Sequence, residues 1–128
     1  MRILLDTHVL LWAASSPERL GASEQDLFLA GQRLISAASI WEPAVKASLG
    51  KLELATNVRS WIPRAVRELH AQPLSITGDH AAAVEHLPPV HRDPFDRLLV
   101  AQALHEGAVL LTADRLLLQY GDMVRLVG

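Results

Sequence analysis

The sequence contains no cysteine among its 128 residues. Disulfides and thiolate zinc sites are therefore excluded, and a reducing compartment such as the cytoplasm is the expected location. Long apolar runs are missing as well, since none approaches the roughly 18 residues of a membrane span. Asp6 interrupts the first apolar run after three residues, which is unlike a signal peptide. We expect a single domain over residues 1–128 that makes no contact with a membrane.

An excess of positive charge is also missing, because the formal net charge is −2. Proteins that bind duplex nucleic acid non-specifically usually carry a basic patch, so this total counts mildly against that activity. Four of the acids are candidate metal ligands, however, and removing their four negative charges from the total leaves +2. Near neutrality is therefore compatible with an RNA substrate.

Several catalytic motifs are absent: the sequence has no glycine-rich phosphate loop, no nucleophile elbow and no Ser/His/Asp set. The six histidines form no pair at metal-binding helical spacing with a third ligand. His8 follows Asp6 by two residues, although such a residue is more often a packed neighbour of a helix cap. His91 precedes a helix start at Asp93, and we expect it in a solvated loop.

Short apolar runs alternate with helix-length segments along the chain. Runs without polar alternation indicate strands that are covered on both faces, as in a parallel sheet. These runs lie at residues 3–5, 34–35, 74–76 and 109–111, with a further edge strand at 123–127. The expected helices cover residues 7–14, 23–31, 37–49, 56–70, 79–86, 94–106 and 115–120. This order predicts a three-layer α/β/α sandwich with a central parallel sheet of four to five strands.

The helix starts are marked by residues that cap well. Ser36 is the expected cap of the helix at 37–49, Thr56 or Asn57 that of the next, and Asp79 that of the one after. Asp93 followed by Pro94 is a strong start signal, because proline suits the first helical position.

Four acids stand where apolar runs end or helices lie, and they form the candidate site: Asp6, Glu42, Asp96 and Asp114. Carboxylates from distant parts of a chain repel each other, so bringing them together is costly unless a divalent cation lies among them. Open α/β sheets place their sites at the ends of neighbouring strands. If these acids meet in space, they predict a metal-dependent hydrolase.

Helix capping is the alternative interpretation of three of these acids. Asp6 and Asp114 each follow an apolar run and precede a helix, so each can be a cap and nothing more. Asp93 and Asp96 form a capping-box arrangement that the helix dipole favours, with Asp93 as the cap. The residues alone do not choose between capping and metal binding.

Glu42 is not explained by capping, because it lies beyond the first turn of a helix that begins after Ser36. An exposed ion pair with Lys46, four residues on, is the simple alternative. The neighbouring Ile40 and Trp41 indicate partial burial, and a buried acid requires a partner or a metal.

Four segments carry a combined signal: LLDTHVLLW, SAASIWEPAVKASLGKLEL, HRDPFDRLLVAQAL and GAVLLTADRLL. In this order they resemble the PIN-domain ribonucleases, specifically the VapC-type toxins of toxin–antitoxin modules, over nearly the whole chain. The resemblance implies a PIN-like parallel sheet with the first strand at its centre. It also implies an endoribonuclease that uses Mg²⁺ or Mn²⁺, an antitoxin partner that blocks the site, and a homodimer.

The resemblance also assigns roles to individual residues. The acidic site of the family corresponds to Asp6, Glu42, Asp96 and Asp114, with Asp93 as a further acid of less certain role. Thr7 and Thr112 correspond to hydroxyl residues that help to arrange the site. Among the basic residues near these segments, the candidate phosphate contacts are Lys46, Arg92 and Arg97.

Pro43 departs from the family, which usually has an aliphatic residue after the helical glutamate. A proline inside a helix loses one hydrogen bond, here to the carbonyl of Ser39, and crowds that carbonyl, at about 3 kcal/mol. We therefore expect the helix to bend, or to begin later than residue 37.

Three other functions stay open. A phosphatase-like domain that uses Mg²⁺ needs a second acid close to the first, as in Asp-x-Asp, whereas Asp6 is followed by Thr7 and His8. A non-catalytic α/β binding module has all its acids as caps and binds no metal. A ribonuclease that uses histidines instead of metal leaves cyclic phosphate ends and is indifferent to chelator.

Overall fold

The fold is built on five parallel strands in one sheet, in the order β3-β2-β1-β4-β5. The structure is a computed structural model and describes residues 1–16, 18, 20–54 and 56–127. The strands are β1 (Arg2–Leu5), β2 (Gln32–Ser36), β3 (Gln72–Leu74), β4 (Val109–Thr112) and β5 (Val124–Leu126). The first strand is central, as the resemblance implied, and the predicted parallel sheet is confirmed with five strands.

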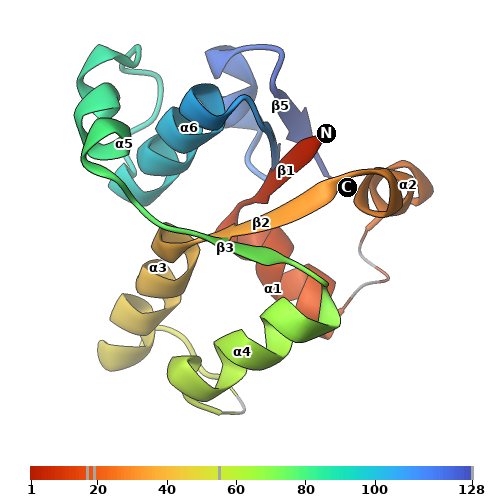
Figure 1. Ribbon diagram of the computed structural model, residues 1–128. Coiled ribbons are helices and arrows are strands. Elements are labelled where there is room, and N and C mark those ends of the chain that lie inside the picture. The colour runs from red at the N-terminus through yellow and green to blue at the C-terminus, as the bar shows by residue number, and fades with distance from the viewer. Residues whose placement is uncertain (17, 19, 55, 128) are drawn as a thin grey trace.

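Helices lie on both sides of the sheet, so the predicted three-layer sandwich is confirmed (Figure 1). The helices are α1 (Thr7–Ser15), α2 (Ala22–Ala30), α3 (Ala37–Ser48), α4 (Val58–Glu68), α5 (Gly78–Ala83) and α6 (Pro94–Glu106), with 3-10 turns η2 (Val84–His86) and η3 (Arg115–Tyr120). α5 and α6 lie on one face, and α1 and α4 lie on the other. Within the described residues, no helix combines the length and the apolar character that a membrane span requires.

The continuous apolar runs follow from this layering. Successive side chains of a strand point to opposite faces, and here both faces are covered. Leu4 and Leu110 pack with α6 on one face, while Ile3 and Leu111 pack with α1 on the other. All four are almost completely buried, so neither face tolerates the polar alternation of a half-exposed sheet.

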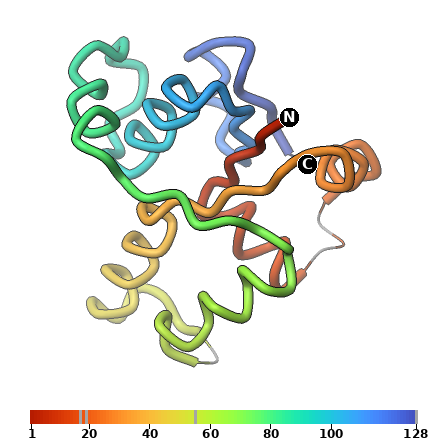
Figure 2. The backbone as a smooth tube through the Cα atoms, in the orientation of Figure 1, coloured from red at the N-terminus to blue at the C-terminus, as the bar shows by residue number. Residues whose placement is uncertain are grey.

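The path of the chain creates a switch in strand order (Figure 2). From β2 the chain passes through α3 and α4 and returns as β3, farther from the centre. From β3 it passes through α5 and α6 on the other face and returns as β4, on the opposite side of β1. The carboxyl ends of β1 and β4 therefore flank the switch point, where open α/β sheets form a crevice.

Two expected positions were wrong. The third strand was predicted at residues 74–76 and lies at Gln72–Leu74, where Pro73 pairs with Ile35. An edge strand has one unpaired side, which accommodates proline, so it needs no apolar run. The fifth helix is capped by Thr77 rather than Asp79, because Thr77 accepts the backbone N–H of His80, whose side chain accepts from the backbone of Thr77 in return.

The helix that carries Glu42 begins where capping placed it. Ser36 accepts the backbone N–H of Ala38 at 3.0 Å, and α3 then runs from Ala37 to Ser48 with Pro43 inside it. The expectation that Pro43 delays the start of the helix was wrong, because the proline lies in the second turn, after the cap has set the first. Asn57 rather than Thr56 caps α4, through the backbone N–H of Ser60.

Candidate active site

An acidic cleft of about 460 Å³ lies at the end of the sheet where β1 and β4 finish. Four candidate acids line it from four parts of the fold, namely Asp6 after β1, Glu42 in α3, Asp96 in α6 and Asp114 after β4. The cleft is also lined by further residues, among them His8, Lys46, His91, Asp93 and Arg115. A larger hollow of about 660 Å³ near the end of α3 has Glu53 as its one described acid. Volume alone therefore does not identify the site.

Asp6 is both a helix cap and a member of the cleft. Its Oδ1 accepts the backbone N–H of Val9 at 2.9 Å, which caps α1. Its Oδ2 accepts from the Thr112 hydroxyl and, at 3.4 Å, from the backbone N–H of Ala113. The residue is 3% exposed, and this burial raises the pKa of Asp6 above its ordinary value despite the hydrogen bonds from Thr112 and Val9.

Asp114 divides its two oxygens in the same way. Its Oδ1 caps η3 by accepting the backbone N–H of Leu116 at 3.0 Å, and its Oδ2 lies 2.7 Å from His91 Nε2. The backbone N–H of Asp114 donates to the Thr112 hydroxyl at 3.0 Å, so Thr112 links Asp114 to Asp6. Capping and a role in the cleft are therefore not alternatives for these acids, because each function uses a different carboxylate oxygen.

Glu42 is buried in the wall of the cleft, with 3% of the residue exposed. Its Oε1 accepts from the Thr7 hydroxyl at 2.7 Å, and its Oε2 accepts from Lys46 Nζ at 2.6 Å. The i,i+4 pair with Lys46 is thus present, but it is not the exposed pair of the simple alternative. The hydrogen bond to Glu42 raises the pKa of Lys46, and the charges of Asp93 and Asp96 add to it.

Asp96 shows most directly that negative charge is in excess here. Burial raises its pKa to about 7, and repulsion from Asp93, Asp6 and Glu42 adds to the shift. Asp93 itself caps α6 by accepting the backbone N–H of Phe95 at 2.8 Å, as predicted. A set of carboxylate oxygens with too few cations among them fits Mg²⁺ or Mn²⁺, which prefer oxygen ligands.

His91 belongs to this cleft, and the expectation of a solvated loop was wrong. Only 13% of its side chain is exposed, and its Nε2 lies 2.7 Å from Asp114 and 3.5 Å from Asp96. One oxygen of each acid and this nitrogen all lie within 4.8 Å of one another. The one signal in the sequence was its place two residues before the Asp93 cap, since Asp93 donates its backbone N–H to His91.

The candidate phosphate contacts separate into two groups. Lys46 lines the cleft, and so does the exposed Arg115, which the sequence analysis passed over. Arg92 is exposed and does not line the cleft. Arg97 donates instead to the carbonyls of the loop before α6, including that of Pro88 at 3.0 Å. These contacts hold the guanidinium against this loop, and a phosphate contact of Arg97 stays a prediction.

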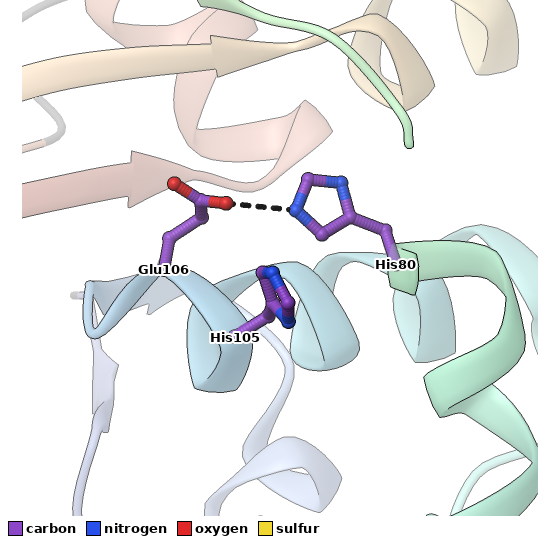
Figure 3. Close-up of side chains that lie close together, drawn as sticks. All are labelled: His80, His105 and Glu106. Atoms are coloured by element: carbon purple, nitrogen blue, oxygen red, sulfur yellow. Dashed lines mark hydrogen bonds and ion pairs between the residues drawn. The ribbon is translucent and has the colours of Figure 1, made fainter. Parts of the chain in front are cut away.

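A second cluster of histidines and an acid lies at the other end of α6 (Figure 3). His80 is completely buried, its Nδ1 accepts the backbone N–H of Thr77 at 3.1 Å, and its Nε2 lies 2.9 Å from Glu106. The ring of His105 stands edge-on to it at 5.0 Å. Because a backbone N–H only donates, Nδ1 is bare and the neutral ring carries its proton on Nε2. That proton occupies the position a metal needs, so the cluster is structural.

The chain belongs to the PIN-domain family, because the family model for the PIN domain matches residues 3–122. It is 36% identical over 115 residues to Ribonuclease VapC22 of Mycobacterium tuberculosis (strain ATCC 25618 / H37Rv), across 88% of this chain and 87% of that protein. The resemblance to VapC-type PIN-domain ribonucleases is thereby confirmed.

Two solved structures share the fold. VapBC2 from Rickettsia felis, bound to a DNA fragment from its promoter, matches with a TM-score of 0.76 at 13% identity, over 100% of both chains. A toxin–antitoxin complex from Klebsiella pneumoniae matches with a TM-score of 0.64 at 19% identity, over 96% of this chain and 95% of that one. At these identities the matches establish the architecture only.

Proposed function

We propose that this protein is a metal-dependent endoribonuclease, the toxin of a type II toxin–antitoxin module. The observation that carries the proposal is that four acids from distant parts of the chain line one cleft at the switch point of the sheet. Membership of the PIN-domain family and the 36% identity to a ribonuclease support it. The acids assigned to the metal are Asp6, Glu42, Asp96 and Asp114.

Three of the four acids have a carboxylate oxygen that the fold itself holds. The caps fix one oxygen of Asp6 and one of Asp114, and the Thr7 hydroxyl fixes one oxygen of Glu42. A bound Mg²⁺ or Mn²⁺ lowers the pKa of water and neutralises charge on the departing oxygen of the phosphodiester. Lys46 and Arg115, which line the same cleft, are placed to attract the phosphate of the RNA.

Cleavage assays test this proposal. The purified protein, freed of any antitoxin, should cut RNA with Mg²⁺ or Mn²⁺ and stop when EDTA is added. Because water rather than the 2′-hydroxyl attacks, the products should carry 5′-phosphate and 3′-hydroxyl ends. Cleavage that persists in EDTA, or 2′,3′-cyclic phosphate ends, would contradict the mechanism and favour a metal-free histidine mechanism.

We also propose an antitoxin protein as the partner and a homodimer as the active unit. Of the two solved structures named above, the one from Klebsiella pneumoniae is a toxin–antitoxin complex and the other is VapBC2 bound to a promoter DNA fragment. Trp41 on α3 and Leu49 at its C-cap are large apolar residues that are 55% and 62% exposed, which suits a protein contact on this helix. Light scattering on the chain alone and with its co-expressed antitoxin should give the mass of a dimer and of a larger complex.

A further inference from the structure

We infer that His91 is a positioning residue. Its Nε2–H donates to Oδ2 of Asp114 and holds this oxygen near Asp96, and His91 does not itself bind the metal. The inference rests on the proposed function, because it concerns the acids assigned to the cation. It adds a residue that the four-acid assignment does not contain.

The proton on the His91 ring is placed by the backbone. The N–H of Asp93 donates to His91 Nδ1 at 3.0 Å, and a backbone N–H cannot accept. The neutral ring therefore carries its proton on Nε2. A neutral histidine binds metal through a bare nitrogen, so the nitrogen that faces the acids is a hydrogen-bond donor and not a ligand.

The Nε2–H of His91 lies within hydrogen-bond distance of Asp114 and farther from Asp96. His91 Nε2 lies 2.7 Å from Asp114 Oδ2, within hydrogen-bond range, and 3.5 Å from Asp96 Oδ2. Asp114 Oδ1 is held by the backbone N–H of Leu116, so both oxygens of Asp114 have a donor. A carboxylate oxygen has a second lone pair, which leaves Asp114 able to bind a cation while His91 orients it.

Asp114 is the most exposed of the four acids. Its side chain is 37% exposed, compared with 19% for Asp96. Asp6 and Glu42 are 3% exposed as residues and are held by protein groups on both oxygens. Without the imidazole, Asp114 Oδ2 is free to turn toward solvent. His91 acts on the least buried of the four acids.

The backbone of His91 is held from two directions. The backbone N–H of His91 donates to the Tyr120 hydroxyl at 3.1 Å, at the end of η3. Arg97 donates to the same hydroxyl at 3.2 Å and to the carbonyl of His91 at 3.4 Å. Arg97 thereby holds the loop that contains His91.

Two substitutions separate the two nitrogens of the ring. In His91→Asn the amide oxygen can still accept the N–H of Asp93, but the side chain is too short to reach Asp114. In His91→Gln the amide nitrogen lies close to the former Nε2 and can donate to Asp114, while the acceptor for Asp93 is lost. The first variant preserves the loop contact, and the second preserves the contact with the acid.

Calorimetric titration with Mn²⁺ alone, on the full chain, is the test. We expect His91→Asn to lose about 10- to 100-fold in affinity and His91→Gln to stay within about threefold of wild type, the range of effects for outer-shell partners being the guide. Thermal melts in EDTA show whether each variant is folded. Pulsed electron paramagnetic resonance of the Mn²⁺-loaded wild type should show no directly bound nitrogen.

Three results would overturn the inference. Retained affinity in His91→Asn with loss in His91→Gln would show that only the loop contact matters. Equal affinity in both variants and wild type would show that the imidazole does not support the site. A nitrogen bound to Mn²⁺ would make His91 a ligand. If folded wild type binds no Mn²⁺, the metal site of the proposed function fails, and the inference fails with it.

Discussion

The two histidine–acid clusters at opposite ends of α6 are built alike and serve different purposes. In each, a backbone N–H holds the Nδ1 of a histidine, and Nε2 faces a carboxylate: His80 with Glu106, and His91 with Asp114. They lie roughly 15 Å apart, judged by the ten residues between Asp96 and Glu106 at 1.5 Å each. The local geometry of the histidine is therefore not what distinguishes a functional cluster from a structural one.

The difference lies in the balance of charge around each pair. Glu106 has Arg2 at 3.0 Å, and the hydrogen bonds from His80 and Arg2 hold its pKa below the ordinary value. Around His91 the acids outnumber the cations, and the pKa of Asp96 rises to about 7 through burial and, in addition, through repulsion from Asp93, Asp6 and Glu42. One cluster is complete as it stands, whereas the other has a surplus of negative charge that a cation would neutralise.

The largest expected effect separates two acids within the cleft. Asp96→Asn should lose activity by about 100-fold or more, since removing a ligand should cost at least as much as removing an outer-shell partner. Asp93→Asn should keep much of the activity, because Asn caps a helix about as well as Asp and the N–H of Phe95 keeps its acceptor. Initial rates of RNA cleavage at saturating Mn²⁺ measure both. Equal loss in two folded variants would show that Asp93 is also a ligand.

The next prediction concerns the structural cluster. His80→Ala leaves a cavity and removes the acceptor for the N–H of Thr77, at about 3 kcal/mol together. The melting temperature should fall by roughly 10 °C for a chain of this size. His105→Ala is the control, because that residue is exposed and should change the melt little. The stabilisation by Mn²⁺ should be the same in both variants as in wild type, and a loss of that response in His80→Ala would contradict the structural role.

Much of the fold follows from local signals in the sequence. Buried runs such as that before Asp6 and that before Asp114 predicted the central strands, and the caps at Ser36 and Asp93 fixed two helix starts. The strand at Gln72–Leu74 was misplaced because an edge strand carries little apolar signal. A sequence pattern reports burial and capping but not the pairing of strands. The central strands and the caps were therefore predicted, and the edge strand was not.

The candidate site was less accessible from sequence. The four acids that line the cleft were named from the sequence, but their presence in one cleft depends on β1 pairing with β4, which no local pattern encodes. His91 was missed because its role comes from Asp114, 23 residues away. The contacts of Arg97 with the carbonyls of Pro88 and Val84 were likewise not visible in the sequence. The parts of the site that depend on contacts between distant residues could therefore not be predicted from local patterns.

The raised pKa of Asp96 should make both the affinity for Mn²⁺ and the stability of the chain depend on pH. Binding of a cation displaces the proton from Asp96, so the affinity for Mn²⁺ should rise by up to about tenfold per pH unit below pH 7 and level off above it. In EDTA the stability of the folded chain should change with pH in the opposite direction. Between pH 3.8 and about 7 the unfolded chain has lost the Asp96 proton that the folded chain keeps, so the stability falls as the pH rises.

Two variants test whether Asp96 is the source of this dependence. Asp96→Asn should lose the titration near pH 7 in both measurements. Asp93→Asn should move it to lower pH, because the charge of Asp93 contributes to the raised pKa of Asp96. Mn²⁺ titrations and melts in EDTA, each across pH 5 to 8.5, are the measurements. A wild-type affinity that does not change across this range would show that Asp96 carries no proton there.

The smallest expected effect is the one that most cleanly divides capping from metal binding. Asp6 is buried, and burial raises its pKa, so its charged form is costly in the absence of metal. In Asp6→Asn the amide oxygen still caps Val9 and no charge is buried, while the amide nitrogen no longer accepts from Thr112 and Ala113. The two effects oppose each other, so in EDTA the stability of the variant should stay within about 1 kcal/mol of wild type. With millimolar Mn²⁺ it should gain much less than wild type, because a ligand stabilises only the folded state that binds it. If the acids were caps and nothing more, Mn²⁺ would shift neither protein. Melts of wild type and of single Asn or Gln variants at the four acids, each in EDTA and in Mn²⁺, would then be superimposable between the two conditions, and the shared site would have to be abandoned while the fold stands.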